Sequence, residues 1–459
     1  MDILSSILAF IVAIGVLVAF HEFGHFWVAR RLGMKVLRFS IGFGKPLAKL
    51  RGRAPDNTEY WLSAIPLGGY VKLLDEREAP VPDAERSRAF NNRPPLHRIA
   101  VLFAGPGFNF VFAILAYWLM FIVGVPSLKP YIGDVVPGSI AAEGGLAAGD
   151  EIRKVGGVET ETLEDATLAI LDELLDDGRI PMTVVGRNGE TRRVELDARG
   201  KVGELSEPDA LFPGLGLELG PVMPPVIGTL LPGGPAAEAG LEVGDRVVAL
   251  NGERVGSFDV LSRLIKQHPN ETVTLRVERG GAELDIPVQV RTIEQEGRTY
   301  PGIGVGASEE ASRELRSLAT RLLTEQRYGV GQALVHGAQK TWEVSALTVR
   351  MLGRMVIGEV SVRNLSGPIA IATYAGDSAQ AGIGAFLSFL ALISVSLGLL
   401  NLLPVPILDG GQIVYQVVEW VKGEPLSERT LIVGQQIGLW LLIVLMGFVF
   451  YNDLTRVFS

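Results

Sequence analysis

Four stretches of the chain lack any Asp, Glu, Lys or Arg over a length that can cross a lipid bilayer. A membrane-spanning helix needs about 20 consecutive apolar residues, so each stretch is long enough or nearly so. The stretches are Ile3–Phe20 (uncharged as far as Ala29 except for Glu22), Ile99–Leu128, Ser378–Leu408 and Thr430–Tyr451. We therefore predict a multi-pass α-helical membrane protein with four transmembrane helices.

The first stretch has a competing interpretation as a secretory signal peptide. Such a peptide has a basic amino-terminal region and a cleavage site of small residues. Here Asp2 is the one charged residue before the stretch, and no cleavage pattern follows it. We favour a retained transmembrane helix.

Charge asymmetry predicts the orientation. The segment Arg30–Arg98 holds 14 Lys and Arg against 7 Asp and Glu, which is typical of a cytoplasmic loop. Both termini, and the region between the second and third stretches, are then expected on the opposite side. The loop Asp409–Arg429 has little charge bias, so one loop carries this prediction.

Composition excludes several function classes. The 459 residues include no Cys, which excludes disulfides, thiolate metal sites and Cys nucleophiles. A net charge of −9 gives no electrostatic support for nucleic-acid binding, and 48% hydrophobic residues exclude a disordered chain. Any metal must be held by His and carboxylate ligands.

Between the second and third stretches the sequence repeats itself. Tyr131–Ile152 and Val226–Val247 align without gaps at an offset of 95, with 11 of 22 positions identical. Both copies contain the pattern I-G-x-x-x-P-G-x-x-A-A-x-x-G-L-x-x-G-D. This pattern resembles the circularly permuted PDZ domain of bacterial proteases. The resemblance implies two small α+β domains, each with a groove where an extended peptide can add as a strand. We expect them to exclude bulky substrates, with partner recruitment as the alternative.

Two further regions have recognisable patterns. Residues 34–75 alternate polar and apolar side chains between turn residues, which predicts β-hairpins close to the membrane. Residues 309–377 have a helical pattern with charges on one stripe around Trp342–Val356. That suits a helix lying on the membrane surface, and a helix facing a protein core is the alternative.

The candidate chemistry begins at the end of the first stretch, with His21-Glu22-Phe23-Gly24-His25. Helical residues four apart face the same side, so both imidazoles can bind one Zn²⁺ while Glu22 lies beside the metal. HExxH also occurs by chance on solvated amphipathic helices. Ionisable groups in an apolar span are costly and usually functional, which favours the metal site.

The third ligand should be a carboxylate, because two neutral His leave Zn²⁺ short of negative charge. Asp409 follows more than twenty uncharged residues in Asn401-Leu402-Leu403-Pro404-Val405-Pro406-Ile407-Leu408-Asp409-Gly410. The prolines interrupt the helix, and broken backbone at membrane depth is tolerated where it is buried in protein or lines a cavity. A solvated Asp at the end of a helix is the alternative.

HExGH on the first stretch, N-x-x-P-x-P-x-x-D-G at the end of the third and the repeats between them resemble the site-2 protease family of intramembrane zinc proteases. The resemblance covers nearly the whole chain. It implies one Zn²⁺ per chain on His21, His25 and Asp409, with Glu22 as the catalytic base. It implies substrate contacts from Asn401, Pro404 and Pro406, and from Gly42, Phe43 and Gly44 in a membrane-associated β-loop.

The resemblance also implies a bacterial inner-membrane enzyme with periplasmic PDZ domains and termini and an active site toward the cytoplasm. Expected partners are the lipid bilayer and transmembrane substrates, such as single-span anti-sigma factors and remnant signal peptides, and no nucleic acid. The predicted parts are residues 1–126 (two spans and the β-loop), 127–221 and 222–308 (PDZ domains), 309–377 (periplasmic helical region) and 378–459 (two spans).

Two other functions compete with an active protease inside the membrane. A membrane-anchored PDZ adaptor with an inactive metal site would have no need of Glu22. A soluble-type metalloprotease on an anchor would not place HExxH within a span and its third ligand two spans later.

Overall fold

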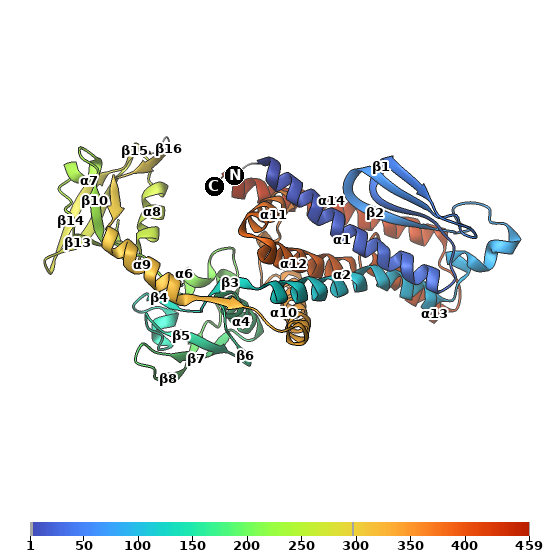
Figure 1. The fold of residues 1–459 in the computed structure, drawn as a ribbon, viewed down its shortest axis with the longest axis horizontal. Helices are drawn as coiled ribbons and strands as arrows, with labels where there is room; N and C mark the ends of the chain where they lie inside the picture. The colour runs from blue at the N-terminus through green and yellow to red at the C-terminus, as the bar shows by residue number, and fades with distance from the viewer. Residues whose placement is uncertain (1–2, 296–297, 459) are drawn as a thin grey trace. The chain divides into compact units, whose positions relative to one another are not determined.

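The computed structural model describes residues 3–295 and 298–458 and divides into two compact units. The helical unit comprises Met1–Val125, Gln326–Val356 and Val362–Ser459. The repeat unit comprises Pro126–Glu325 and Ile357–Ser361. Figure 1 gives the element labels used below.

Seven helices and one strand pair dominate the described part of the helical unit. Four of the helices, α1, α2, α12 and α14, are long and apolar enough to cross a membrane. The bounds are α1 Ile3–Arg31, β1 Val36–Arg51, β2 Glu59–Leu73, α2 Pro95–Val123, α10 Val330–Val356, α11 Pro368–Ala381, α12 Ile383–Asn401, α13 Asp409–Lys422 and α14 Glu428–Phe458. Short 3₁₀ turns lie at Asp83–Arg88, Phe90–Asn92 and Val362–Asn364.

The third uncharged stretch is not one continuous helix. It begins inside α11, breaks at Gly382, where φ is +114°, and continues as α12 to Asn401. The remainder, as far as Leu408, is irregular and contains the two prolines. The prediction from the sequence missed the break at Gly382, because a charge count carries no information about backbone direction.

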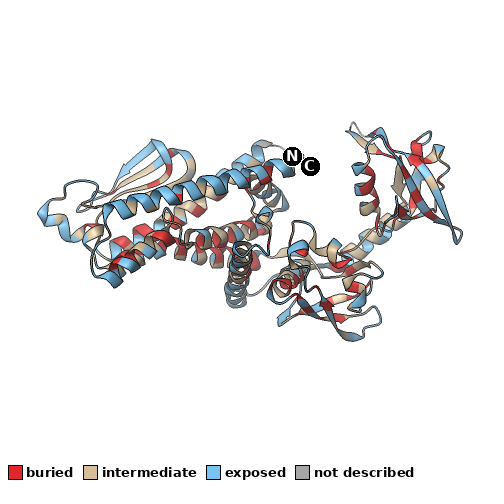
Figure 2. Ribbon diagram, turned by 180° about the vertical axis from the view of Figure 1, so that it is seen from behind, coloured by how far each residue is buried: buried red, intermediate tan, exposed pale blue. Residues whose placement is uncertain are grey.

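Helix α2 lies at the centre of the helical unit, with α1, α10, α12 and α13 packed against it. Its buried residues include Ala113, Ala116 and Tyr117, which join a core with α1 and α12. Buried residues follow α2 and α12, whereas α14 is largely exposed along its length (Figure 2). Exposed apolar side chains such as Trp440 and Val444 make α14 suited to contact with lipid.

Helix α10 has the amphipathic character that the sequence predicts, and one of its faces packs on protein. Gly337 allows the backbone of α2 to approach closely, since a Cβ there would lie 3.0 Å from the Ile114 carbonyl oxygen and from the Trp118 nitrogen. Trp342 is 74% exposed. The core-facing alternative therefore describes part of α10, and contact of the rest with a membrane surface remains a prediction.

The predicted β-hairpins form a single pair of long strands, each of which folds back on itself. Residues 38–41 of β1 pair with residues 59–62 of β2 in one ladder and with residues 69–72 in another. The outer end of β1, residues 48–51, pairs with residues 59–62 from the other side. The result is a small curled sheet that packs on α1 (Figure 1).

The repeat unit contains two domains with the same order of main-sheet strands. The four-stranded sheets are β6-β5-β7-β8 and β12-β11-β13-β14, and a separate pair, β4-β9 or β10-β17, completes each domain. The 95-residue offset extends from β4 and β10 through α4 and α8. The first domain has β4 Ile132–Val135, α3 Ile140–Glu143, β5 Glu151–Val155, β6 Val158–Glu159, α4 Leu163–Asp176, β7 Arg179–Val185, β8 Thr191–Asp197, α5 Val202–Leu205, α6 Leu211–Leu215 and β9 Leu217–Leu219.

The second domain differs before its last strand, where a hairpin replaces two short helices. Its elements are β10 Ile227–Leu230, α7 Pro235–Glu238, β11 Arg246–Leu250, β12 Glu253–Arg254, α8 Phe258–Gln267, β13 Thr272–Arg279, β14 Ala282–Gln289, β15 Arg291–Gln295, β16 Arg298–Gly302 and β17 Val305–Ala307. Helix α9 Glu309–Leu322 follows, and β18 Leu323–Gln326 pairs with β3 Val125–Leu128. The predicted boundary between residues 221 and 222 remains a prediction.

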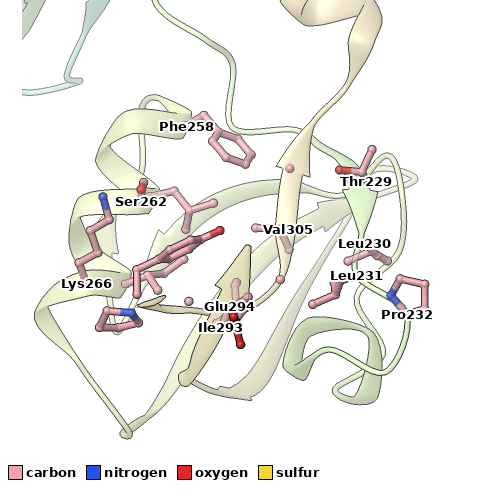
Figure 3. Close-up of a pocket in the computed structure, with 18 residues that line it drawn as sticks. Thr229, Leu230, Leu231, Pro232, Phe258, Ser262, Lys266, Ile293, Glu294 and Val305 are labelled. Atoms are coloured by element: carbon pink, nitrogen blue, oxygen red, sulfur yellow. The ribbon is translucent and has the colours of Figure 1, made fainter. Parts of the chain in front are cut away.

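A groove of about 300 Å³ lies in the second domain between α8 and the strand β17. Phe258, Ser262 and Lys266 line it from α8, and Val305 lines it from β17 (Figure 3). A groove between a helix and a strand is the arrangement expected of a domain that accepts an extended peptide.

The shared Gly-Asp of the repeats has a structural role. Asp245 is 1% exposed, accepts a hydrogen bond from the Glu242 nitrogen at 2.9 Å and pairs with Arg279 at 2.6 Å. Asp150 makes the corresponding contacts with the Ala147 nitrogen and Arg192. The Asp thus ties the turn before the central strand to the sheet in both domains.

We predict that Asp245→Asn destabilises the second domain by about 1.5–3 kcal/mol, the usual contribution of hydrogen bonds to a charged group. The Arg279 guanidinium lowers the pKa of Asp245 below its ordinary 3.8. The stabilisation is therefore complete above pH 3.8 and is lost as pH falls through the folded-state pKa. Hydrogen exchange of this domain at pH 7 and pH 3 measures both effects. Asp285→Asn, at an exposed pair with Arg276, is the control; equal protection in the two variants would contradict the prediction.

Candidate metal centre

Helix α1 carries both predicted His ligands on one face. His21 and His25 lie four residues apart, and each is 9% exposed. Their Nε2 atoms are 3.2 Å apart. Glu22 follows His21 on the same helical turn, as the predicted base should.

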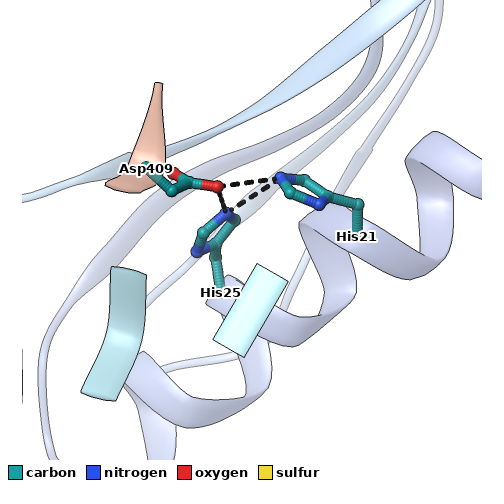
Figure 4. A group of neighbouring side chains, drawn as sticks. All are labelled: His21, His25 and Asp409. Atoms are coloured by element: carbon teal, nitrogen blue, oxygen red, sulfur yellow. Dashed lines mark hydrogen bonds and ion pairs between the residues drawn. The ribbon is translucent and has the colours of Figure 1, made fainter. Parts of the chain in front are cut away.

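Asp409 joins the two imidazoles from a distant part of the sequence (Figure 4). Its Oδ2 lies 3.3 Å from Nε2 of His21 and 3.4 Å from Nε2 of His25. Asp409 is the first residue of α13, where the positive end of the helix dipole favours a carboxylate. At the other end of α13, Glu419 pairs with Arg98 of α2 at 2.8 Å, and both side chains are about nine-tenths buried.

The triangle of ligand atoms fits a tetrahedral metal ion. Zn²⁺ bonds His nitrogen and carboxylate oxygen at about 2.0–2.2 Å, which gives tetrahedral edges of about 3.3–3.6 Å. The three measured edges of 3.2, 3.3 and 3.4 Å are close to one face of such a tetrahedron. A metal ion held by these three ligands would keep one position for a water molecule or a substrate.

The lone pairs of the three candidate ligands also favour a bound cation. Nδ1 of His25 lies 2.7 Å from the Val101 carbonyl oxygen, so Nδ1 carries the proton and donates it. In neutral His25 the lone pair of Nε2 therefore points toward the carboxylate and the other imidazole. Lone pairs this close repel one another unless a proton or a metal ion lies between them.

Two glycines allow α1 and α2 to approach closely at this site. A Cβ on Gly24 would meet the Ala104 carbonyl oxygen. A Cβ on Gly105 would meet Nε2 of His25 and would lie 2.8 Å from Cε1 of His21. The backbone of α2 thus forms one wall of the metal centre.

The curled sheet reaches the site through Gly69. A Cβ on Gly69 would lie 2.9 Å from Cγ of Glu22 and 2.9 Å from a methyl group of Val18. The predicted substrate residues Gly42, Phe43 and Gly44 have their recorded contacts within the hairpin, where the Phe43 ring stacks on Tyr70 at 6.2 Å. Their substrate role remains a prediction.

The other predicted substrate residues lie between α12 and α13. Asn401 is the last residue of α12 and is half-buried, Pro404 is exposed and Pro406 is half-buried. The carbonyl of Pro406 accepts a hydrogen bond from Gln412 at 2.7 Å. Within the described residues, no recorded hydrogen bond joins Asn401 to the three ligands, so its role also remains a prediction.

Four residues that sequence reasoning did not select lie against the metal centre, one of them being Val101, whose carbonyl contacts His25. Asn109 of α2 has Nδ2 3.1 Å from Nδ1 of His21, and Gly105 and Gly69 make the close approaches described above. A signal was available for Asn109, because a polar side chain in the middle of an apolar helix is uncommon. The glycines gave no such signal in a chain with 55 of them.

The family model for peptidase family M50 matches residues 9–445, which include both HExxH and Asp409. The chain belongs to peptidase family M50. It is therefore a metalloprotease, and its M50 membership accounts for the convergence of two His on the apolar helix α1 with Asp409 at the start of α13.

Full-length relatives agree with the M50 assignment. The chain is 40% identical over 457 residues to "Regulator of sigma-E protease RseP" of Escherichia coli, covering 99% of this chain and 100% of the relative. It is 41% identical to "Protease RseP" of Yersinia pestis (99% and 100%) and 40% identical to the "Putative zinc metalloprotease" of Vibrio cholerae (99% and 99%). Among solved structures, the PDZ domain of an SdrC-like protein from Listeria monocytogenes matches 18% of this chain and 87% of its own at 21% identity, with a TM-score of 0.17.

We predict that Gly105→Ala lowers metal affinity by about 10–100-fold, the range found when groups that orient metal ligands are disturbed. The added methyl group would displace both imidazoles, although alanine is by itself the better helix former. Gly107→Ala is the matched control, because its nearest neighbour is a Phe103 ring atom at 3.5 Å. Metal content after dialysis measures the effect, and equal retention by the two variants would contradict the prediction.

Proposed function

We propose that this M50 protease hydrolyses peptide bonds within transmembrane segments, using one Zn²⁺ held by His21, His25 and Asp409. The observation that carries the proposal is the triangle of ligand atoms, with edges of 3.2–3.4 Å, two of whose corners lie on the membrane-length helix α1. A site for soluble substrates would not need to be built into such a helix. The zinc metalloprotease name of the Vibrio cholerae relative supports the choice of metal.

Each residue of the site has a part in hydrolysis. A bound zinc ion supplies Lewis acidity, which lowers the pKa of a water molecule to about 7 and polarises a carbonyl group. Glu22 accepts a proton from the attacking water and delivers it to the departing amine. The Val101 carbonyl holds the His25 ring in orientation through Nδ1, 2.7 Å away.

The substrate must also change shape before it is cut. A helical peptide bond has its carbonyl hydrogen-bonded and shielded by neighbouring side chains, so the segment has to unwind. An extended segment can pair with the edge of a sheet. We assign this role to the curled sheet, because Gly69 brings one of its ladders against Glu22.

The proposed substrates and location follow from the resemblance to site-2 proteases, and the name of the Escherichia coli relative supports them through its mention of sigma-E. The sigma-E regulation in the name of the Escherichia coli relative supports the proposal that this chain cuts single-span proteins of the anti-sigma-factor type. We propose remnant signal peptides as further substrates because they have a similar single-span form. We place it in the inner membrane, with its PDZ-like repeats and both termini in the periplasm and its active site toward the cytoplasm. The repeats would admit substrates already trimmed to a short outer tail.

Glu22→Gln separates proteolysis from an adaptor function. The amide keeps the size of the side chain but cannot accept a proton, so cleavage of a membrane substrate should fall by about 10²–10⁴-fold. Metal content should stay at the wild-type level, because Glu22 is not a ligand. Near-normal cleavage by this variant would assign the base to another residue, and a wild-type chain that binds zinc but cleaves no membrane substrate would favour an adaptor.

Reporter fusions test the orientation. The excess of Lys and Arg in Arg30–Arg98 predicts that this segment is cytoplasmic. A reporter that is active only in the periplasm should work when fused after Ser308 and fail when fused after Arg53. The opposite pattern would invert the proposed topology.

A further inference from the structure

Asn109 is held at a fixed place beside the metal centre. It is fully buried on α2, and its backbone carbonyl accepts a hydrogen bond from the Ser394 hydroxyl of α12 at 2.9 Å. Its Cβ lies 3.3 Å from the position that a Cβ on Gly398 would occupy. Its amide nitrogen lies 3.1 Å from Nδ1 of His21, and its Oδ1 has no hydrogen-bond partner among the described residues.

Which ring nitrogen of His21 carries the proton determines whether this ring can bind a metal. A neutral imidazole carries one proton, on either Nδ1 or Nε2. Nε2 of His21 faces Asp409 and His25 and must be free of its proton to act as a ligand. The proton must then lie on Nδ1, which needs a hydrogen-bond acceptor in contact with it.

The amide of Asn109 can meet this need in one of its two orientations. With Nδ2 donating to Nδ1, the proton of His21 lies on Nε2 and points at the carboxylate of Asp409, where it blocks the metal. A half-turn of the amide exchanges its two ends and places Oδ1 next to Nδ1. Because the oxygen and nitrogen of an amide have nearly the same shape, the exchange requires no repacking of α2.

We propose that Asn109 is a positioning residue for the metal centre, presenting Oδ1 to the Nδ1–H of His21 and so keeping Nε2 of His21 free to bind zinc. The proposal rests on the proposed zinc site and adds a function for a residue that touches neither metal nor substrate. The Val101 carbonyl does the same for His25, so α2 supplies the acceptor for both imidazoles. Ligand histidines in metalloproteins usually donate their second N–H in this way.

Two substitutions distinguish an acceptor from a group that merely fills space. Asn109→Leu keeps a similar shape and removes the acceptor, so zinc affinity should fall by about 10–100-fold. Asn109→Asp offers only acceptor atoms to Nδ1 and should keep an affinity close to that of the wild type. Ser394→Ala is the control, because Ser394 contacts the Asn109 backbone but none of the ligands.

The measurement is zinc affinity by chelator competition on the purified full-length chain, with the visible spectrum of the Co²⁺-substituted protein as a second readout. The helical circular dichroism of each preparation shows whether the variant is folded. Zinc affinity as low for Asn109→Asp as for Asn109→Leu would overturn the acceptor role, and wild-type zinc affinity for Asn109→Leu would overturn positioning altogether. A wild-type chain without a tight zinc site would instead overturn the proposed function.

Discussion

Three donor atoms lie 3.2–3.4 Å apart, two on the apolar helix α1 and one at the start of α13, and they repel one another unless a proton or a metal ion lies between them; this is the constraint on which the rest of the helical unit depends. Bilayer and protein interior offer little water to separate such groups, so the fold must hold them together until a cation does so. That requirement explains why the His21 imidazole has polar contacts with Asn109 of α2 and with Asp409 at the start of α13. It also explains why the carboxylate comes from the start of a helix, where the dipole favours it.

Helix α2 organises the centre through residues on a single face. Val101, Gly105 and Asn109 follow one another at intervals of four and therefore lie on one stripe of the helix. They hold His25, make room for both rings and contact His21, respectively. One turn before this stripe, Arg98 fixes the far end of α13, the helix that begins with Asp409. Helix α2, which supplies no ligand itself, thus helps to position all three ligands.

The sequence was sufficient to predict the parts of the site that depend on local helix geometry or on the rarity of charged residues near apolar stretches. The convergence of His21 and His25 was predictable because helical spacing of four is a local property, and that of Asp409 because charged residues are rare near apolar stretches. Their role as metal ligands remains a prediction. The contact of Gly69 with Glu22 depends on how two strands fold back, and no pattern along the chain encodes that pairing. Gly382 was missed for a related reason, since hydropathy does not report where a helix ends and another begins.

The close packing of α1 on α2 limits how this protein can be made more robust. Replacing glycine by alanine within helices is a common route to higher thermal stability. Gly24 and Gly105 cannot be replaced in this way, because a methyl group at either position would clash with the opposing helix or the ligand rings. Gly15 and Gly447 have no neighbour within 4 Å of an added Cβ and are open to it. Stabilised forms of this enzyme for structural work should therefore carry their alanines at such open positions of α1 and α14, leaving the α1–α2 contact in its native, glycine-containing form.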